Sequence, residues 1–112
     1  MSGHDLLVEL SEKVRLLDVA ISQLKTRGSS YAQAEHDYKV ALSQQMLTER
    51  DGGLPATILS DVCRGKKHIA KLRFERDVAE VSYKAAQEAI NSYKLQIRIM
   101  DSQISREYGA VK

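Results

Sequence analysis

Cys63 is the residue with the clearest potential for chemistry, because a run of positive charge follows it directly. Nearby cations lower the pKa of a thiol and favour the reactive thiolate. A nucleophilic cysteine also needs a base and an acid that orients the base, and the sequence places no such pair around Cys63. We therefore expect a buried or incidental thiol. A single cysteine excludes an internal disulfide and is typical of a reducing cytosol.

Three histidines, His4, His36 and His68, could act as metal ligands or as bases. None of them forms the H-x-x-x-H or E-x-x-H spacing that brings two ligands to one helix face. Glu35 and Asp37 flank His36, but neighbouring residues of a helix point in different directions. The chain also has no glycine-rich phosphate loop. The sequence thus predicts no catalytic residue, no metal site and no cofactor, and we expect a protein that is not an enzyme.

Positive charge is concentrated directly after Cys63. Six cations fall within thirteen residues, with Glu75 as the only acid among them. We call them the basic cluster: Arg64, Lys66, Lys67, Lys71, Arg73 and Arg76. If a helix begins at Lys66, its free backbone N–H groups add to the positive field. The basic cluster is predicted to bind an acidic protein surface or the phosphates of a nucleic acid; an ordinary solvated helix start is the alternative.

Composition is typical of long, solvated helices. The chain has 112 residues, of which 43% are hydrophobic and 29% charged, so it forms one domain at most and is not a disordered tail. Its net charge of +2 is too small to argue for nucleic acid. No stretch approaches the roughly 20 apolar residues of a membrane span, and the first residues do not resemble a signal peptide. We expect a cytoplasmic protein without a membrane partner.

Two stripes of residues, one on each side of the single proline, carry the strongest pattern in the chain. Their steps alternate between three and four residues, which keeps one face of a helix toward a partner helix. The first stripe comprises Leu7, Leu10, Val14, Leu17, Ile21, Leu24, Gly28, Tyr31, Glu35, Tyr38, Leu42 and Gln45. The second stripe comprises Ile69, Leu72, Arg76, Ala79, Tyr83, Ala86, Ile90, Tyr93, Ile97, Met100 and Ile104.

The segment between the stripes predicts where the chain reverses. Gly52-Gly53 ends a helix, and Pro55 prevents its continuation. We therefore predict an all-α, coiled-coil-like antiparallel hairpin that occupies one domain, residues 1–112. Its long helices cover about 5–49 and about 66–108, and the connector, about 50–65, holds a short helix over about 57–64.

The register of the hairpin follows from the two stripes. In an antiparallel pair, the alternating core positions face each other when residue numbers sum to 114. The predicted layers include Gly28 with Ala86, Tyr31 with Tyr83, and Tyr38 with Arg76. Glu35 and Arg76 fall in adjacent layers, so we predict that they form a core charge pair, which can fix the register.

Gly28 is the one position where the first long helix could break. Glycine inside a helix costs about 1 kcal/mol relative to alanine, and Ser29 or Ser30 could cap a new helix. However, the three-four spacing continues in phase across Gly28, and a loop would shift it. We therefore predict a continuous helix, straight or kinked, with a break at Gly28 as the alternative.

The second long helix carries another apolar stripe, about 160° around the helix from the core seam. Its members are Phe74, Val78, Val81, Ala85, Leu95 and Ile99. Because a hairpin buries only one side of each helix, an extra apolar face indicates a further covering surface, although scattered surface hydrophobes are common. A bare hairpin also has little core. We predict that this self-association face forms a homodimer, as a four-helix bundle.

Three segments, residues 31–42, 70–80 and 83–98, resemble a family of small proteins encoded by phages and prophages of Gram-positive bacteria. The resemblance covers the chain from about residue 24 onward and brings no catalytic motif. It implies a bacterial cytoplasm and a protein that binds and modulates a host or phage machine. Replication, recombination, or a defence nuclease such as a CRISPR effector, which the protein would inhibit, are the candidate machines.

A second comparison is with the WXG100-type secreted helical hairpins, which share the size and shape. This chain contains no Trp, and Gly52-Gly53 lacks the Trp-x-Gly turn of that family. The pattern formed by Tyr31 and Glu35 lies in mid-helix and not in a C-terminal export tail. This alternative is therefore the weaker resemblance.

Overall fold

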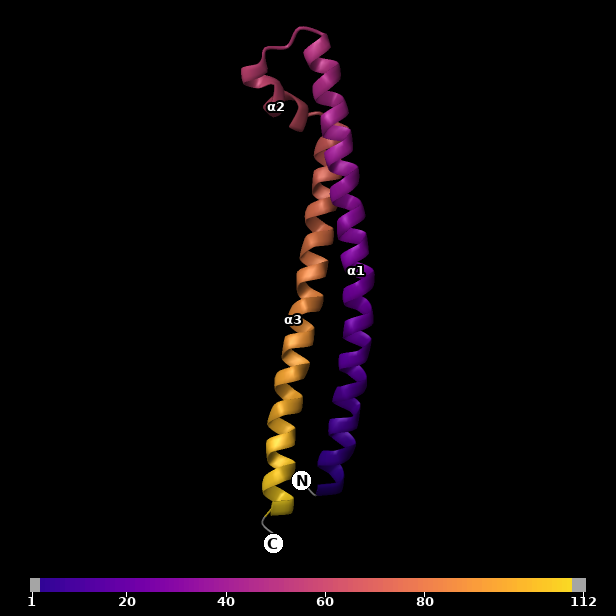
Figure 1. Ribbon diagram of the computed structural model, residues 1–112, viewed down its shortest axis with the longest axis vertical. Helices are drawn as coiled ribbons and strands as arrows, with labels where there is room; N and C mark the ends of the chain where they lie inside the picture. Colours follow the sequence, from indigo (N-terminus) through magenta and orange to yellow (C-terminus); the bar gives the residue numbers. More distant parts are fainter. Residues whose placement is uncertain (1–2, 110–112) are drawn as a thin grey trace. The chain divides into compact units, whose positions relative to one another are not determined.

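The computed structural model describes residues 3–109, and all of its elements in this range are helical (Figure 1). Helix α1 spans Gly3–Asp51, α2 spans Ala56–Arg64, and α3 spans Lys67–Gly109. These bounds lie within two residues of the predicted ones. The predicted all-α antiparallel hairpin with a short helix in its connector is therefore confirmed.

Helix α1 continues through Gly28 without interruption. A glycine and two serines reduce the helix propensity of this stretch, but tertiary packing along an apolar face outweighs such local preferences. The continuous three-four spacing therefore identified the helix correctly.

The connector follows the turn chemistry of its sequence. Gly53 has a φ of 93°, in the left-handed region that glycine adopts without strain. The backbone N–H of Leu54 then donates to the carbonyl oxygen of Glu49 at 3.0 Å, which satisfies a free carbonyl at the end of α1. Pro55, with a φ of −59°, precedes the first residue of α2. The backbone conformation of Gly53, the hydrogen bond from Leu54 and the proline at position 55 together end α1 and redirect the chain.

Packing divides the described chain into two compact units, and the predicted single domain stays a prediction. Unit 1 contains α1 up to Thr26 and α3 from Lys84, and unit 2 is Arg27–Tyr83. Unit 2 therefore holds the connector, α2 and the adjoining parts of the two long helices.

Unit 2 shows the antiparallel pairing directly. The rings of Tyr31 and Tyr83 stack with centroids 6.0 Å apart, and the Arg76 guanidinium lies over the Tyr38 ring. Both are predicted layers, so the predicted register is confirmed at these two positions. The Arg27 side chain, from Nη1, also donates to the carbonyl oxygen of Ser82 at 3.2 Å, which joins α1 to the α3 backbone.

The core of unit 2 is centred on α2 and the start of α3. Cys63 and Ile69 are completely buried, and Leu59 and Tyr38 are nearly so. Leu59 and Cys63 lie four residues apart, on the face of α2 that is buried. These two side chains pack α2 into the core of unit 2, and its N-cap residue, Pro55, makes no side-chain hydrogen bond.

Unit 1 buries a face of α1 that differs from the predicted one. Leu7, Val14 and Ile21 are exposed by 44%, 43% and 36%, whereas Leu6 and Ala20 are buried. Leu10, Leu17 and Leu24 of the predicted stripe remain half-buried, so the buried face is rotated by only part of the 100° that separates neighbouring residues. The prediction was wrong for Leu7, Val14 and Ile21. Leu6-Leu7 and Ala20-Ile21 each offer two apolar neighbours, between which the sequence does not choose, and beside Val14 the half-buried residue is Lys13.

Helix α3 follows its predicted stripe throughout. All eleven stripe residues, from Ile69 to Ile104, are buried or half-buried. The three-four spacing runs without a break from Ile69 to Ile104, so the sequence pattern was sufficient to predict the buried face of α3.

Candidate functional site

Four members of the basic cluster are exposed at one end of unit 2: Arg64 ends α2, and Lys67, Lys71 and Arg73 lie in the first turns of α3. Within residues 3–109, none of the four forms an ion pair or a side-chain hydrogen bond. Their charges are therefore available to a negatively charged partner.

Lys66 has an intramolecular partner instead. Its Nζ lies 3.2 Å from Oε1 of Glu49, which links the residue before α3 to the last turns of α1. Gln45 also donates to Oε1 of Glu49, at 2.9 Å. This ion pair lies at the junction of the helices and neutralises one of the predicted partner-binding cations.

Arg76 belongs to the seam between α1 and α3, not to the exposed basic cluster. Its side chain is only 21% exposed, and its guanidinium carbon lies 4.7 Å from the centroid of the Tyr38 ring. Nε and Nη2 of Arg76 both donate to Oδ1 of Asp77, at 3.1 and 2.8 Å. The predicted contact of Arg76 with a partner stays a prediction, and the structure places its side chain in contacts within the chain.

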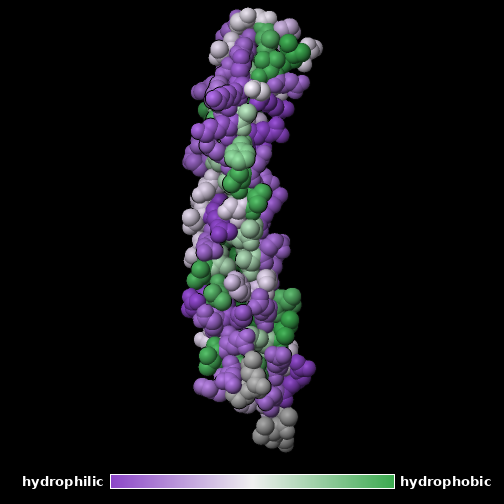
Figure 2. All heavy atoms as spheres, turned by 180° about the vertical axis from the view of Figure 1, so that it is seen from behind, coloured by the Kyte–Doolittle hydropathy of each residue, from purple (hydrophilic) through white to green (hydrophobic). Residues whose placement is uncertain are grey.

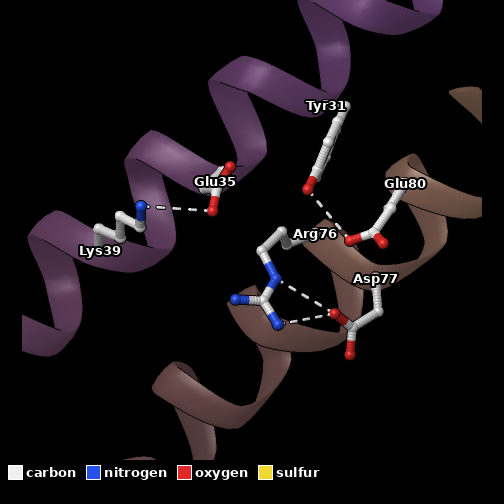
Figure 3. Close-up of polar contacts among 6 residues, drawn as sticks. All are labelled: Tyr31, Glu35, Lys39, Arg76, Asp77 and Glu80. Carbon is white, nitrogen blue, oxygen red and sulfur yellow. Dashed lines mark hydrogen bonds and ion pairs between the residues drawn. The ribbon is translucent and has the colours of Figure 1, made fainter.

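The predicted core charge pair between Glu35 and Arg76 also differs in the structure (Figure 3). Glu35 forms its ion pair with Lys39 at 3.3 Å, one turn along α1, and Arg76 pairs with Asp77 on α3. Hydrogen bonding to Asp77 raises the pKa of Arg76, and the negative charge of Glu35 makes a smaller contribution in the same direction. Partners on the same helix prevail because they need no alignment of two helices.

Tyr31 adds a polar contact across the seam. Its hydroxyl donates to Oε2 of Glu80 at 3.1 Å (Figure 3). This hydrogen bond to a carboxylate raises the pKa of the Tyr31 phenol above its ordinary value of 10.0. The seam of unit 2 therefore contains two tyrosines, Tyr31 and Tyr38, that each contact a charged group of α3.

The predicted self-association face is exposed on α3. Phe74 and Val81 are 67% and 68% exposed, and Val78, Leu95 and Ile99 are each more than half exposed. Ala85 is exposed as well. Figure 2 shows one side of the surface, on which hydrophobic residues form separate patches among hydrophilic ones. Exposed apolar residues that lie together on one helix face are candidates for contact with another chain.

An apolar groove between α1 and α2 was not predicted. It has a volume of about 330 Å³, and Leu42, Met46, Leu47 and Leu59 form its apolar lining. The pair Met46-Leu47 lies beyond the last residues of the first stripe, and an apolar pair outside the seam was the signal that could have indicated this groove. Figure 2 shows hydrophobic surface at the same end of the molecule, over the α2 region.

Cys63 lies in the core of unit 2. Its side chain is completely buried, as the sequence predicted, so substrates cannot reach the sulfur. His36 lies on the exposed surface with Nδ1 3.3 Å from Oδ1 of Asp37. Within residues 3–109, no group of three histidine, cysteine or acidic side chains could hold a metal ion. In the same range, no helix is both long and apolar enough to cross a membrane.

No family model matches the sequence, and neither a curated protein nor a solved structure matches it. The resemblance to phage and prophage proteins therefore remains a prediction.

Proposed function

We propose that the chain is a non-catalytic protein-binding module that contacts an acidic surface of its partner through the exposed part of the basic cluster. The observation that carries this proposal is the set of four exposed cations without an intramolecular partner, at the end of unit 2 where α2 meets α3. Complementary charge steers the encounter of two proteins and selects the partner.

The setting of this interaction follows the resemblance to phage and prophage proteins. We propose a bacterial cytoplasm, and a partner that is a host or phage machine of replication, recombination or defence. A small helical module would modulate such a machine by occupying an acidic surface of it, which includes inhibition of a defence nuclease. Nucleic acid is the second candidate partner, because exposed lysine and arginine side chains also bind phosphates.

A charge-reversal variant tests the proposal. R64E/R73E inverts two exposed cations of the basic cluster, and K25E/R98E makes the same change in net charge at exposed positions of unit 1. Each variant and the wild-type chain are used for affinity purification from lysogenic bacteria, with and without nuclease. Circular dichroism verifies that both variants remain helical.

The proposal predicts a protein that the wild type and K25E/R98E retain, that R64E/R73E loses, and that moderate salt releases. It is contradicted if R64E/R73E retains the same proteins as the wild type. If nuclease removes every captured component, and if the chain binds duplex DNA with a salt slope of several counterions, nucleic acid is the partner instead.

A further inference from the structure

Helix α3 carries a second heptad series on its exposed side, and this series includes charged residues as well as apolar ones. Steps of four and three residues link Lys67, Lys71, Phe74, Val78, Val81, Ala85 and Glu88. All of them are exposed, and all lie on the single helix α3, so helical periodicity alone places them on one face. The same spacing continues through Ser92 to Leu95 and Ile99. Within the face, the stretch from Lys71 to Glu88 has an apolar centre with a cation at one end and an anion at the other.

This order of residues is self-complementary for an antiparallel copy. When two α3 helices pack antiparallel with the alternating heptad positions opposed, the numbers of facing residues sum to 159. Val78 then faces Val81 of the partner subunit, and Phe74 faces Ala85 of the partner subunit. Lys71 faces Glu88 of the partner subunit. Two-fold symmetry makes each of these contacts twice.

Size and charge both favour this register. The largest side chain of the face, Phe74, lies opposite the smallest, Ala85, which is how helix surfaces interdigitate. Lys71 and Glu88 form no ion pair within residues 3–109, so each has a charge to offer a second chain. A parallel pairing in register would place Lys71 against Lys71 and Phe74 against Phe74, so repulsion and crowding select the antiparallel arrangement.

We propose that the chain forms a two-fold symmetric homodimer through this face of α3, with two Lys71–Glu88 ion pairs flanking an apolar centre of Phe74, Val78 and Val81. Because the face lies about 160° around α3 from the seam, the two α3 helices form the inner pair and each α1 packs on the outer side. The dimer uses Lys71 and leaves Arg64 and Arg73 exposed for the partner of the proposed function.

A charge-swap experiment tests the dimer and its register. Sedimentation or light scattering over a range of concentrations gives the dimer dissociation constant of the wild type, K71E, E88K and K71E/E88K. Each single change places two pairs of like charges in the dimer, so we expect dimerisation to weaken by at least about tenfold. The double change restores opposite charges, and we expect it to return to within about threefold of the wild type.

Controls separate the dimer from folding and from partner binding. K94E alters an exposed residue on another side of α3 and should leave the dissociation constant unchanged. Circular dichroism shows whether the single variants keep their helix content. The inference is overturned if the wild type is monomeric at millimolar concentration, if K71E and E88K dimerise as the wild type does, or if the double variant is not restored. None of these outcomes depends on R64E/R73E, so the partner proposal is judged separately.

Discussion

The guanidinium of Arg76 lies over the ring of Tyr38, with 4.7 Å between the guanidinium carbon and the ring centroid. Tyr38 belongs to α1 and is nearly fully buried, and Arg76 belongs to α3. The cation is held against the ring because Asp77 accepts two of its hydrogen bonds at the edge of the seam. This contact joins the two long helices of unit 2 in the predicted register.

A double-mutant cycle measures this contact. We expect R76M to lower the free energy of unfolding by about 1 kcal/mol, the size of a partly desolvated cation–π interaction. The same change should have almost no effect in a Y38L background, which gives a coupling free energy of about 1 kcal/mol in urea unfolding. R73M is the matched control, because Arg73 is exposed and should not couple to Tyr38. Additive effects of R76M and Y38L would contradict the role given to the contact.

Gly28 and Tyr83 are the basis of a second prediction. A Cβ at residue 28 would lie 3.2 Å from Cε2 of Tyr83, so the ring must shift by a few tenths of an ångström. We expect G28A to change the free energy of unfolding by less than about 0.5 kcal/mol, because the gain in helix propensity, about 1 kcal/mol, is offset by the displaced ring. In a Y83A background the same change should stabilise by about 1 kcal/mol.

The control for Gly28 is S29A, at an exposed position of the same helix. Its effect should be equal in the presence and absence of the Tyr83 ring. If G28A also has equal effects in the two backgrounds, steric contact with Tyr83 does not limit the substitution. Thermal unfolding followed by circular dichroism provides both comparisons.

Burial of Cys63 predicts slow thiol chemistry in the native protein. The side chain is completely buried, and Ile69 at the start of α3 is buried to the same degree. A thiol reagent should therefore label Cys63 only when this region opens. I69A creates a cavity that costs about 2–5 kcal/mol, and we expect it to speed labelling by at least about tenfold. A cysteine introduced by A32C in a C63A background, at an exposed position, should react at once. Immediate labelling of the native wild-type chain would contradict the predicted burial.

Alkaline pH should remove the contribution that Tyr31 makes to the free energy of unfolding. Its hydrogen bond to Glu80 raises the pKa of the phenol in the folded state above the ordinary value of 10.0. A group whose pKa is raised on folding stabilises fully below its unfolded pKa, and this stabilisation is lost as the pH rises through the folded pKa. Y31F should therefore be less stable than the wild type at pH 7, and the difference should shrink above about pH 10. Urea unfolding of both proteins between neutral and alkaline pH measures this difference, and a constant difference would exclude the effect.

Local patterns in the sequence were sufficient for the elements and for part of the seam. Gly52-Gly53 and Pro55 fixed the end of α1 because their backbone chemistry acts over a few residues. The stripe of α3 was correct because it keeps the three-four spacing from Ile69 to Ile104, whereas the second apolar series is interrupted at Glu88 and Ser92. Tyr31 with Tyr83, and Tyr38 with Arg76, followed from the register of the two stripes.

Tertiary structure decided which side chains meet wherever the sequence offered equivalent choices. In unit 1 it buried Leu6 and Ala20 in place of Leu7 and Ile21. In unit 2 it paired Arg76 with Asp77 and not with the predicted Glu35, which itself pairs with Lys39. In unit 1 the physical reason is that neighbouring residues differ by about 100° in direction, so either member of an apolar pair can face the seam. Packing against the opposite helix then selects among neighbouring residues of similar hydrophobicity or charge. The sequence of one helix alone does not show which of them the opposite helix contacts.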